Sequence, residues 1–274
     1  MRGIPSLITD IRKNVFTEVA RMAYAGGDYS KAEDLPYVIV PGDPGRCEKI
    51  AKYFDDAHFV ASNREFTTWT GTLLGEKVSV CSTGIGGPST AIAIEELVEC
   101  GADTFIRLGT SGGIDLTVQG GDVVVATGAV RQEGTSREYM PLEYPAVPDF
   151  DVTLALRDGI RAAGLKVHTG VVQAKDSFYG QHRPSVMPIA PKLEYQWDAW
   201  KRGGVLCSEM ESAALFTVCN YLRVRSGAAF HVIWNQERRD AGIDDVHAPD
   251  MEPTLQAVIE GLKLLIQRDR EENT

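Results

Sequence analysis

The sequence predicts a single α/β domain in which a central mixed β-sheet lies between flanking helices, giving three layers. Two observations predict this class. Short apolar runs typical of buried strands alternate along the 274 residues with amphipathic helical segments, and this pattern is typical of a sheet covered on both faces. No repeat, low-complexity stretch or linker interrupts the alternation. Residues 1–274 are therefore expected to form one domain, with a core over about 37–266.

Helices are expected where apolar residues recur at intervals of three and four. The first is an N-terminal amphipathic helix over about 6–24, which Gly26 and Gly27 end. The last begins near Pro253, because proline suits the first turn of a helix. It is expected to end at Ile266, before a frayed, charged tail over 268–274. The other expected helices are a short one that ends near Phe54 and those at about 92–98, 151–163 and 211–222.

Strands are expected where short apolar or β-branched runs meet glycine, proline or other turn residues. The run 37–40 stops at Pro41 and Gly42, and the β-rich region 58–82 contains a hairpin turn at 74–77. The remaining expected strands are 105–108, 123–126, 170–174 and 228–233. Because helices separate most of these strands, the sheet is expected to be mixed or largely parallel.

The composition limits the classes of function. Hydrophobic residues make up 43 % and charged residues 24 %, and 28 basic against 38 acidic side chains give a net charge of −10. Such an acidic chain has no general attraction for nucleic acid or anionic membranes, so neither partner is expected and any phosphate must be held by local donors. No apolar run approaches the ~20 residues that span a bilayer. Charged residues interrupt every apolar stretch near the N-terminus, so no signal peptide is expected there. The five cysteines are scattered, so we expect reduced thiols in a cytoplasmic protein.

Three glycine-rich segments follow expected strands, at 42–46, 84–90 and 109–113. Ligands of open α/β sheets collect beyond the carboxyl ends of strands, and glycine lets backbone amides approach an anion closely. None of the segments has the spacing of a P-loop or of GxGxxG, so each alone is consistent with a plain turn. Arg46 and Arg107 stand beside two of them. Arg107 lies within an apolar strand, where it either forms a buried ion pair or binds a phosphate or carboxylate ligand.

Two further clusters carry candidate ligand-binding groups. Glu209, Met210 and Glu211 stand at the start of an expected helix, where the carboxylates either complement the helix dipole or accept hydrogen bonds from the hydroxyls of a ribose. The segment 178–183, Phe-Tyr-Gly-Gln-His-Arg, offers an aromatic face, an amide and a guanidinium, which suit a flat heterocycle. The alternative for this segment is an ordinary polar surface loop. Among the five histidines, His182 is the one expected near such a site.

Five segments resemble, in order and spacing, the uridine phosphorylases of the nucleoside phosphorylase family. They are VPGDPGR at 40–46, SNREFTTW at 62–69, CSTGIGGPST at 81–90, RLGTSGG at 107–113 and EMESA at 209–213. The resemblance covers about 37–266. It implies a nucleoside phosphorylase-like α/β fold and the reversible phosphorolysis of uridine to uracil and ribose 1-phosphate, as in pyrimidine salvage. Inorganic phosphate would be the co-substrate, and no cofactor would be required.

The resemblance also implies roles for individual residues. The phosphate would be bound by Gly42, Arg46, Arg107, Thr110 and, from a neighbouring subunit, Arg64. The ribose would be bound by Thr110, Met210 and Glu211. The base would be bound by Ser111, Gly112, Phe178, Gln181, Arg183, Glu209 and Ile233. In the family a monovalent cation such as K⁺ can also be bound at the dimer interface, here by Glu65, Ile85 and Ser89. A shared site makes the homodimer the smallest competent unit, and the family usually forms hexamers of three dimers.

The implied chemistry needs no acid–base pair. Breaking the glycosidic bond develops positive charge on the ribose and negative charge on the departing uracil, and phosphate beside the anomeric carbon is both nucleophile and counter-charge. Arg107, Gln181 and Arg183 are the implied catalytic residues, and the last two would stabilise the leaving base. Purine phosphorylases resemble one another in an Asp that protonates the base, where this chain has Asn235. This difference favours pyrimidine nucleosides.

The chain departs from the family pattern in three places. Its segment 178–181 lacks the proline of Phe-Tyr-Pro-Gly-Gln, which leaves the register of Gln181 and Arg183 open. No histidine precedes His58, whereas many relatives place an N-terminal histidine against the ribose 5′-hydroxyl in a neighbour's site. The bulky Trp234 stands where relatives often carry a small aliphatic residue, and it either narrows the pocket or packs elsewhere.

Three other functions remain alternatives at this stage. A purine nucleoside phosphorylase would differ in the base that it accepts. A nucleosidase of the same superfamily would use water in place of phosphate, and the arginines at 46, 64 and 107 argue against it. A non-catalytic nucleoside-binding protein of the same fold would bind its ligand without turnover, and the intact phosphate and ribose motifs argue against that.

Overall fold

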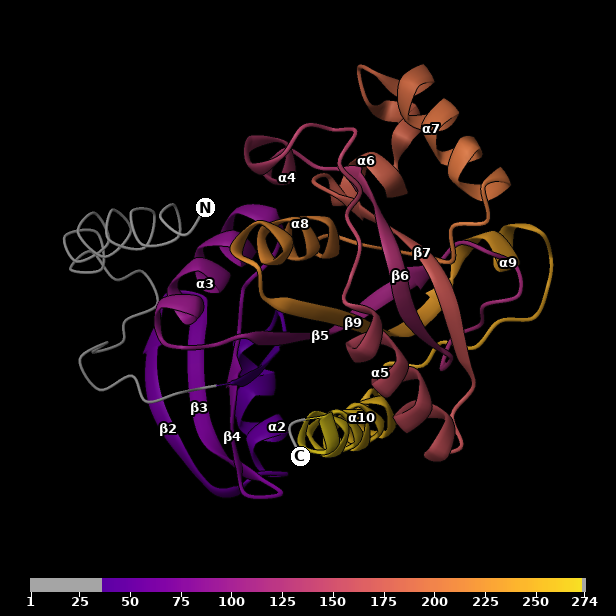
Figure 1. Ribbon diagram of the computed structural model, residues 1–274. Helices are drawn as coiled ribbons and strands as arrows, with labels where there is room; N and C mark the ends of the chain where they lie inside the picture. Colours follow the sequence, from indigo (N-terminus) through magenta and orange to yellow (C-terminus); the bar gives the residue numbers. More distant parts are fainter. Residues whose placement is uncertain (1–35, 273–274) are drawn as a thin grey trace.

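A computed structural model describes residues 36–272, in which nine strands form one mixed sheet (Figure 1). The strand order is β2-β3-β4-β1-β5-β8-β7-β6-β9, and β9 also pairs with β5. Strands β5, β8, β7, β6 and β9 therefore close into a ring, and β1, β4, β3 and β2 extend from β5 as an open sheet. The strands are Tyr37–Val40 (β1), Asp55–Asn63 (β2), Phe66–Leu73 (β3), Glu76–Cys81 (β4), Thr104–Gly113 (β5), Val123–Gln132 (β6), Val167–Lys175 (β7), Cys207–Glu209 (β8) and Arg225–Asn235 (β9).

Strand β5 connects the ring to the open sheet, because it has a partner on each side. It pairs in parallel with β9 along its length and with β1 up to the pair Val40 and Arg107. Strand β8 pairs with β5 only at its far end, at Gly112 and Gly113. In the described part of the chain, residues 108–111 of β5 thus pair with β9 alone. This change of partner opens the sheet at the carboxyl end of β1.

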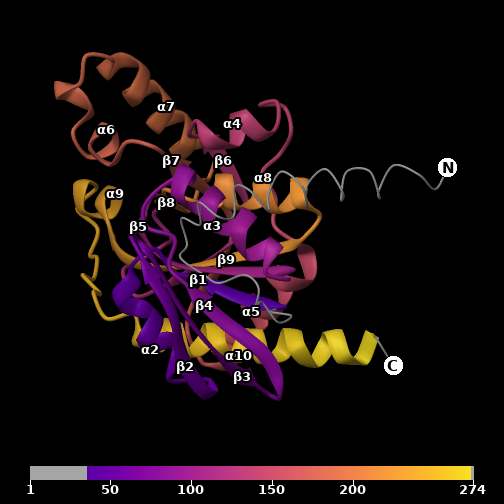
Figure 2. The same ribbon diagram turned by 90° about the vertical axis from the view of Figure 1, so that its left-hand side faces the viewer.

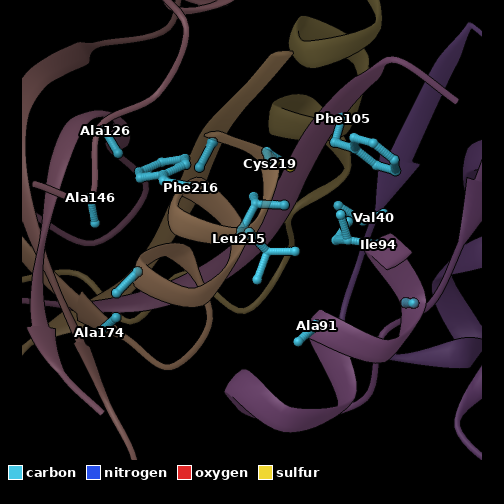
Figure 3. Close-up of a cluster of buried hydrophobic side chains, with 14 of the residues drawn as sticks. Val40, Ala91, Ile94, Phe105, Ala126, Ala146, Ala174, Leu215, Phe216 and Cys219 are labelled. Atoms are coloured by element: carbon cyan, nitrogen blue, oxygen red, sulfur yellow. The ribbon is translucent and has the colours of Figure 1, made fainter. Parts of the chain in front are cut away.

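Two layers of helices cover the strands, as Figures 1 and 2 show from perpendicular directions. Helices α3 and α8 pack on one face over a cluster of apolar side chains that includes Ile94, Phe105 and Phe216 (Figure 3). Helices α2, α5 and α10 cover the other face, so the three-layer α/β class is confirmed. The helical elements are Pro44–Arg46 (η3), Cys47–Ala51 (α2), Gly87–Glu99 (α3), Thr135–Tyr139 (α4), Phe150–Ala162 (α5), Phe178–His182 (α6), Pro184–Val186 (η4), Ala190–Arg202 (α7), Ser212–Leu222 (α8), Gln236–Asp240 (α9) and Glu252–Glu272 (α10).

The expected strands and helices within the described residues are present, generally with longer bounds. The main difference concerns residues 109–113, which we expected as a loop and which instead continue strand β5. Their pairing with β9 and β8 explains the extension, because the backbone groups of these residues find partners in the sheet. The N-terminal helix expected over 6–24 lies outside the described residues.

The last helix, α10, also extends further than the sequence indicates. Residues 268–272 are helical, although their high charge predicts a frayed tail. The Arg268 guanidinium donates to Asp158 at 2.7 Å, and both oxygens of Asp269 accept from the Arg225 guanidinium at 2.7 and 2.6 Å. These partners lie on α5 and β9, so the charged turns are docked on the body of the protein rather than left in solvent.

Helix α7 is the longest element that the sequence pattern does not predict. None of its side chains is fully buried, and its partly buried apolar residues Leu193, Trp197 and Trp200 stand among many charged ones, so the pattern that predicts a packed helix is weak. Together with α6 it protrudes beyond the sheet (Figure 1). Among residues 36–272, no helix is both long and apolar enough to cross a membrane.

Candidate active site

A cavity of about 1280 Å³ lies where the sheet opens beyond β1. Its walls come from the carboxyl ends of β1, β4, β5, β7, β8 and β9 and from the segments that directly follow them. Every site residue expected from the sequence lines it, with the exception of Arg64 and Arg183. The expected residues that line it are Gly42, Arg46, Glu65, Ile85, Ser89, Arg107, Thr110, Ser111, Gly112, Phe178, Gln181, Glu209, Met210, Glu211 and Ile233.

One end of the cavity combines two guanidinium groups with glycine backbone. Arg46 follows the turn after β1, and Arg107 projects from β5 directly beside that turn. A Cβ atom on Gly42 would lie 3.2 Å from Nη2 of Arg107 and 3.0 Å from the Gly84 carbonyl oxygen, so glycine permits this close approach. Burial lowers the pKa of the Arg46 guanidinium, which still carries its charge at neutral pH. This end therefore suits an anion.

Arg107 is buried at 4 % exposure and has specific partners on three sides. Its Nη1 donates to the hydroxyl of Thr83 at 2.9 Å and to the Val40 carbonyl oxygen at 3.3 Å. Its Nη2 donates to Oε2 of Glu211 at 2.5 Å. The buried ion pair that the sequence left as one alternative is thus present, and it forms part of the wall of the cavity. Its Nε has no hydrogen-bond partner among the described residues.

The two carboxylates at the start of α8 have different surroundings. Glu211 accepts from the backbone amide of Gly86 at 2.6 Å through its second oxygen, so it joins α8 to the segment before α3. Glu209 accepts from the amides of Glu211 and Ser212 at 2.8 and 3.0 Å, and from the Ser212 hydroxyl at 2.5 Å. Glu209 therefore complements the helix N-terminus. Burial and then the nearby Glu211 carboxylate raise the pKa of Glu209.

The opposite end of the cavity carries an exposed aromatic ring, an amide and a buried amine. Phe178 is 52 % exposed at the start of α6, and Gln181 follows one turn later. Lys175 at the end of β7 is 6 % exposed, and its Nζ donates to the Ser208 hydroxyl at 2.6 Å. Burial lowers the pKa of Lys175 to about 8. The sequence analysis missed Lys175, although a lysine that ends an apolar strand was the signal available.

Aromatic side chains also line this end of the cavity. The His182 ring lies 4.3 Å from Phe178 and stacks at 6.4 Å on Trp234, measured between ring centroids. The Arg239 guanidinium lies 5.0 Å from the centroid of the Trp234 ring. His182 and Trp234 both line the cavity, as do Gln236 and Arg239, which the sequence analysis did not single out. Of the two alternatives for Trp234, a residue of the pocket wall is the one observed.

Two expected site residues do not line the cavity of this chain. Arg64 is exposed in the turn between β2 and β3, where a neighbouring subunit's site is the expected place for it. The guanidinium of Arg183 instead lies over the ring of Tyr179, 4.6 Å from its centroid. Helix α6 is a single turn that Ser177 caps, and Arg183 follows it as an exposed residue. The cations that line the cavity at this end are the buried Lys175 and Arg239, which lies over Trp234.

The expected cation-binding residues offer oxygen atoms at the rim of the cavity. The Ser89 hydroxyl donates to the Ile85 carbonyl oxygen at 3.3 Å, and Glu65 also lines the wall. A Cβ atom on Gly84 would lie 2.7 Å from the Glu65 side chain, so Glu65 is held close to this loop. Carboxylate, carbonyl and hydroxyl oxygens are suitable ligands for a hard cation.

The fold and the cavity define an α/β protein with a small-molecule site at the carboxyl ends of its strands, suited to an anion at one end and a flat heterocycle at the other. The chain belongs to the phosphorylase superfamily, whose family model matches residues 36–264.

Relatives in this family are similar over most of the chain. A uridine phosphorylase of Treponema pallidum is 54 % identical over 240 residues, covering 87 % of this chain and 93 % of the relative. A uridine phosphorylase of Escherichia coli is 42 % identical over 235 residues, covering 85 % and 90 %. A guanosine phosphorylase of Halorubrum lacusprofundi is 40 % identical over 190 residues, covering 69 % and 74 %. The chain is therefore similar to phosphorylases of both pyrimidine and purine nucleosides.

The ion pair of Arg107 and Glu211 generates a prediction about stability. The substitution Glu211→Gln leaves a buried guanidinium without its counter-charge and is expected to lower the free energy of unfolding by about 3 kcal/mol. Urea unfolding in phosphate-free buffer measures this change. As a control, Asp198→Asn breaks the exposed pair with Arg202 and should cost less than about 0.5 kcal/mol. Equal losses in the two variants would contradict the assigned importance of the buried pair.

Proposed function

We propose that this protein is a uridine phosphorylase, which converts uridine and inorganic phosphate reversibly into uracil and ribose 1-phosphate. The observation that carries the proposal is one continuous cavity with Arg46 and Arg107 at one end and Phe178, Gln181 and Lys175 at the other. Two uridine phosphorylases among the relatives support the choice of substrate. The activity needs inorganic phosphate as co-substrate and no organic cofactor.

At the anion end, Arg46 and Arg107 bind the phosphate together with the backbone at Gly42 and the hydroxyl of Thr110. Two guanidinium groups neutralise most of the charge of a phosphate dianion and present several donors to its oxygens. Thr110 lies on the part of β5 that pairs with β9 alone, so its side chain is half-buried at the cavity wall. The phosphate is thereby held as a nucleophile at a defined place.

The ribose lies between the two ends, beside Thr110, Met210 and Glu211. Glu211 is held on both oxygens, by Arg107 and by the amide of Gly86. A carboxylate retains further lone pairs beyond two such contacts, so it can accept from ribose hydroxyls without releasing Arg107. Phosphate and sugar are thus positioned against the same ion pair, and this positioning reduces the entropic part of the barrier.

The base lies at the far end, where Phe178 offers a ring face and Gln181 an amide, within a wall that includes Ser111, Gly112, Glu209 and Ile233. As the glycosidic bond breaks, negative charge develops on the uracil ring. The ammonium group of Lys175 stabilises this charge, because it is buried beside Ser208, whose hydroxyl contacts Gln181 at 2.7 Å. Lys175 takes the role that the resemblance assigns to Arg183, which lies outside the cavity.

The buried side chain of Asn235 supports pyrimidine over purine nucleosides. Asn235 is fully buried, and its amide donates to the carbonyl oxygens of Asp115 and Val118 at 2.8 Å each. Its side-chain oxygen accepts from the amide of Arg238 and so caps α9. An amide with these contacts offers no acid to protonate a purine. Uracil leaves as an anion that Lys175 stabilises, so no such acid is needed.

We further propose that the working unit is at least a homodimer, in which Arg64 of one subunit completes the phosphate site of its partner. The exposed position of Arg64 on the β2–β3 turn supports this. The same proposal includes the assembly of three dimers into a hexamer and a cytoplasmic location. It also includes K⁺ binding by Glu65, Ile85 and Ser89. The alternatives are a purine nucleoside phosphorylase, a nucleosidase and a non-catalytic binding protein.

An assay of base release distinguishes these functions. The protein is incubated with uridine, inosine or guanosine, with and without phosphate, and the released bases and sugars are measured. Phosphate-dependent release of uracil with ribose 1-phosphate is expected, and release from the purine nucleosides should be at least a hundredfold slower. Comparable release of base from inosine or guanosine would favour a purine nucleoside phosphorylase. Release of free ribose without phosphate would favour a nucleosidase, and binding without turnover would favour a non-catalytic protein.

The lowered pKa of Lys175 predicts the alkaline side of the pH profile. Below pH 8 the amine is protonated and stabilises the uracil anion, so kcat/KM for uridine should fall as the pH rises through about 8. Lys175→Gln should lose this alkaline limb and lower kcat by about a hundredfold. The control Lys166→Gln changes a lysine that is 59 % exposed and outside the cavity, and it should leave the profile intact. An unchanged alkaline limb in Lys175→Gln would refute the role of Lys175.

Mixed subunits test the shared site. Arg46→Ala and Arg64→Ala chains are expected to be nearly inactive alone, because each homodimer lacks a phosphate ligand in both of its sites. After subunit exchange, about half of the dimers are hybrids, and each hybrid contains one intact site out of two. Up to about a quarter of the wild-type activity per chain should therefore return. Exchange is verified with two differently labelled chains. Complete exchange without recovered activity would show that Arg64 does not act in its partner's site.

A further inference from the structure

A chain of hydrogen bonds runs from α7, outside the cavity, to Gln181 inside it. Its members are Trp200, Gln132, Gln173, Ser208 and Gln181, which lie on α7, β6, β7, β8 and α6. The proposed function uses Gln181 but does not explain which of its two amide atoms meets the base. The donors and acceptors along this chain answer that question.

The first step depends on the indole of Trp200, which can only donate a hydrogen bond. Its Nε1 lies 3.0 Å from Oε1 of Gln132, so the oxygen of that amide must face Trp200. The nitrogen of the same amide then points the other way, and it donates to Oε1 of Gln196 at 3.1 Å. Trp200 thereby fixes the orientation of Gln132.

The second step passes this orientation to Gln173, which is 2 % exposed. Oε1 of Gln132 has a second lone pair, and with it this oxygen accepts a hydrogen bond from Nε2 of Gln173. Because the nitrogen of Gln173 faces Gln132, its oxygen must face Ser208, and the distance between this oxygen and the Ser208 hydroxyl is 2.6 Å. Gln173 is therefore a hydrogen-bond acceptor toward Ser208.

The third step depends on the single proton of the Ser208 hydroxyl. The ammonium group of Lys175 donates to this hydroxyl at 2.6 Å, so one lone pair is occupied. The proton is given to Oε1 of Gln173, because that oxygen cannot donate. The remaining group on Ser208 is a lone pair, and it faces Gln181 at 2.7 Å. A donor on Gln181 satisfies this lone pair, whereas an oxygen at the same distance would be repelled.

We infer that Trp200 acts as a positioning residue that, through Gln132, Gln173 and Ser208, turns the amide nitrogen of Gln181 toward Ser208 and its oxygen toward the base. In the described geometry Oε1 is the atom near Ser208, and a half-turn of the amide exchanges the two atoms without moving the rest of the side chain. The inference rests on the proposed function, because Gln181 is taken to contact the base.

An amide oxygen that faces the base selects among pyrimidines. Uracil carries an N–H between its two carbonyl groups and can donate to this oxygen. Cytosine has an unprotonated ring nitrogen at the same position, so two lone pairs would face each other. A site that leaves a buried polar group unpaired in this way discriminates strongly against the wrong ligand. The relay therefore makes Trp200 a determinant of the preference for uridine over cytidine.

The experiment compares the binding of cytidine and uridine in variants of the two neighbouring tryptophans. Trp200→Phe keeps an aromatic ring on α7 but removes the N–H that orients Gln132. Trp197→Phe is the matched control, because the Trp197 indole donates to Glu237 at 2.8 Å and is not part of the relay. For each protein the inhibition constant of cytidine is divided by the KM of uridine, measured with saturating phosphate.

The ratio is expected to fall about fivefold to tenfold in Trp200→Phe, as one hydrogen bond loses its unique direction, and less than twofold in Trp197→Phe. Gln132→Met, which removes the same acceptor from the other side, should repeat the effect of Trp200→Phe. In a Gln181→Ala background, Trp200→Phe should change the ratio no further.

The relay is overturned if Trp200→Phe and Trp197→Phe give equal ratios, or if Trp200→Phe still shifts the ratio in the Gln181→Ala background. In both cases, uridine turnover by the wild type would still support the proposed function. Wild-type protein that releases no uracil from uridine and phosphate overturns the proposed function, and with it the role given to Gln181.

Discussion

The geometry of the cavity depends on the buried contact between Arg107 and Glu211. Removing two charges from water is costly, and the cost is offset here by close pairing and by further partners, the Thr83 hydroxyl and the Gly86 amide. These contacts join β5 to the segment between β4 and α3 and to the start of α8. Elements that are distant in the sequence therefore meet at one point, directly beyond the carboxyl end of β1. Under the proposed function, the phosphate and the ribose both lie against this point.

A protein with a net charge of −10 holds two guanidinium groups in one cavity, and this contrast has a physical explanation. At physiological ionic strength the influence of exposed carboxylates fades over about 8 Å, whereas charges within a partly closed cavity are screened much less. The nearest groups therefore decide what the cavity accepts. Arg46 and Arg107 line one end and Lys175 the other, so under the proposed function the phosphate and the departing base each lie near a cation.

Much of the fold and of the anion end was predictable from the sequence, because both depend on local patterns. Apolar runs marked the strands, and the glycines beside Arg46 and Arg107 marked the turn that the cavity uses. Features that depend on pairing between distant segments could not be predicted from local patterns. The extension of β5 through Gly113 depends on its pairing with β9 and β8. Helix α7 was missed because its apolar residues are few and only partly buried among charged ones. The inward position of Lys175 and the outward position of Arg183 could not be assigned, because they depend on how the segment after β7 packs and not on a local pattern.

The absence of buried side chains on α7 has a consequence for substitutions on this helix. None of its side chains belongs to the two apolar clusters, so substitutions at its exposed positions are expected to cost little free energy of unfolding. Yet α7 reaches the far end of the cavity through the polar contacts of Trp200 and Gln132. Under the inferred relay, a substitution at Trp200 therefore changes the choice of base without altering any side chain of the two apolar clusters.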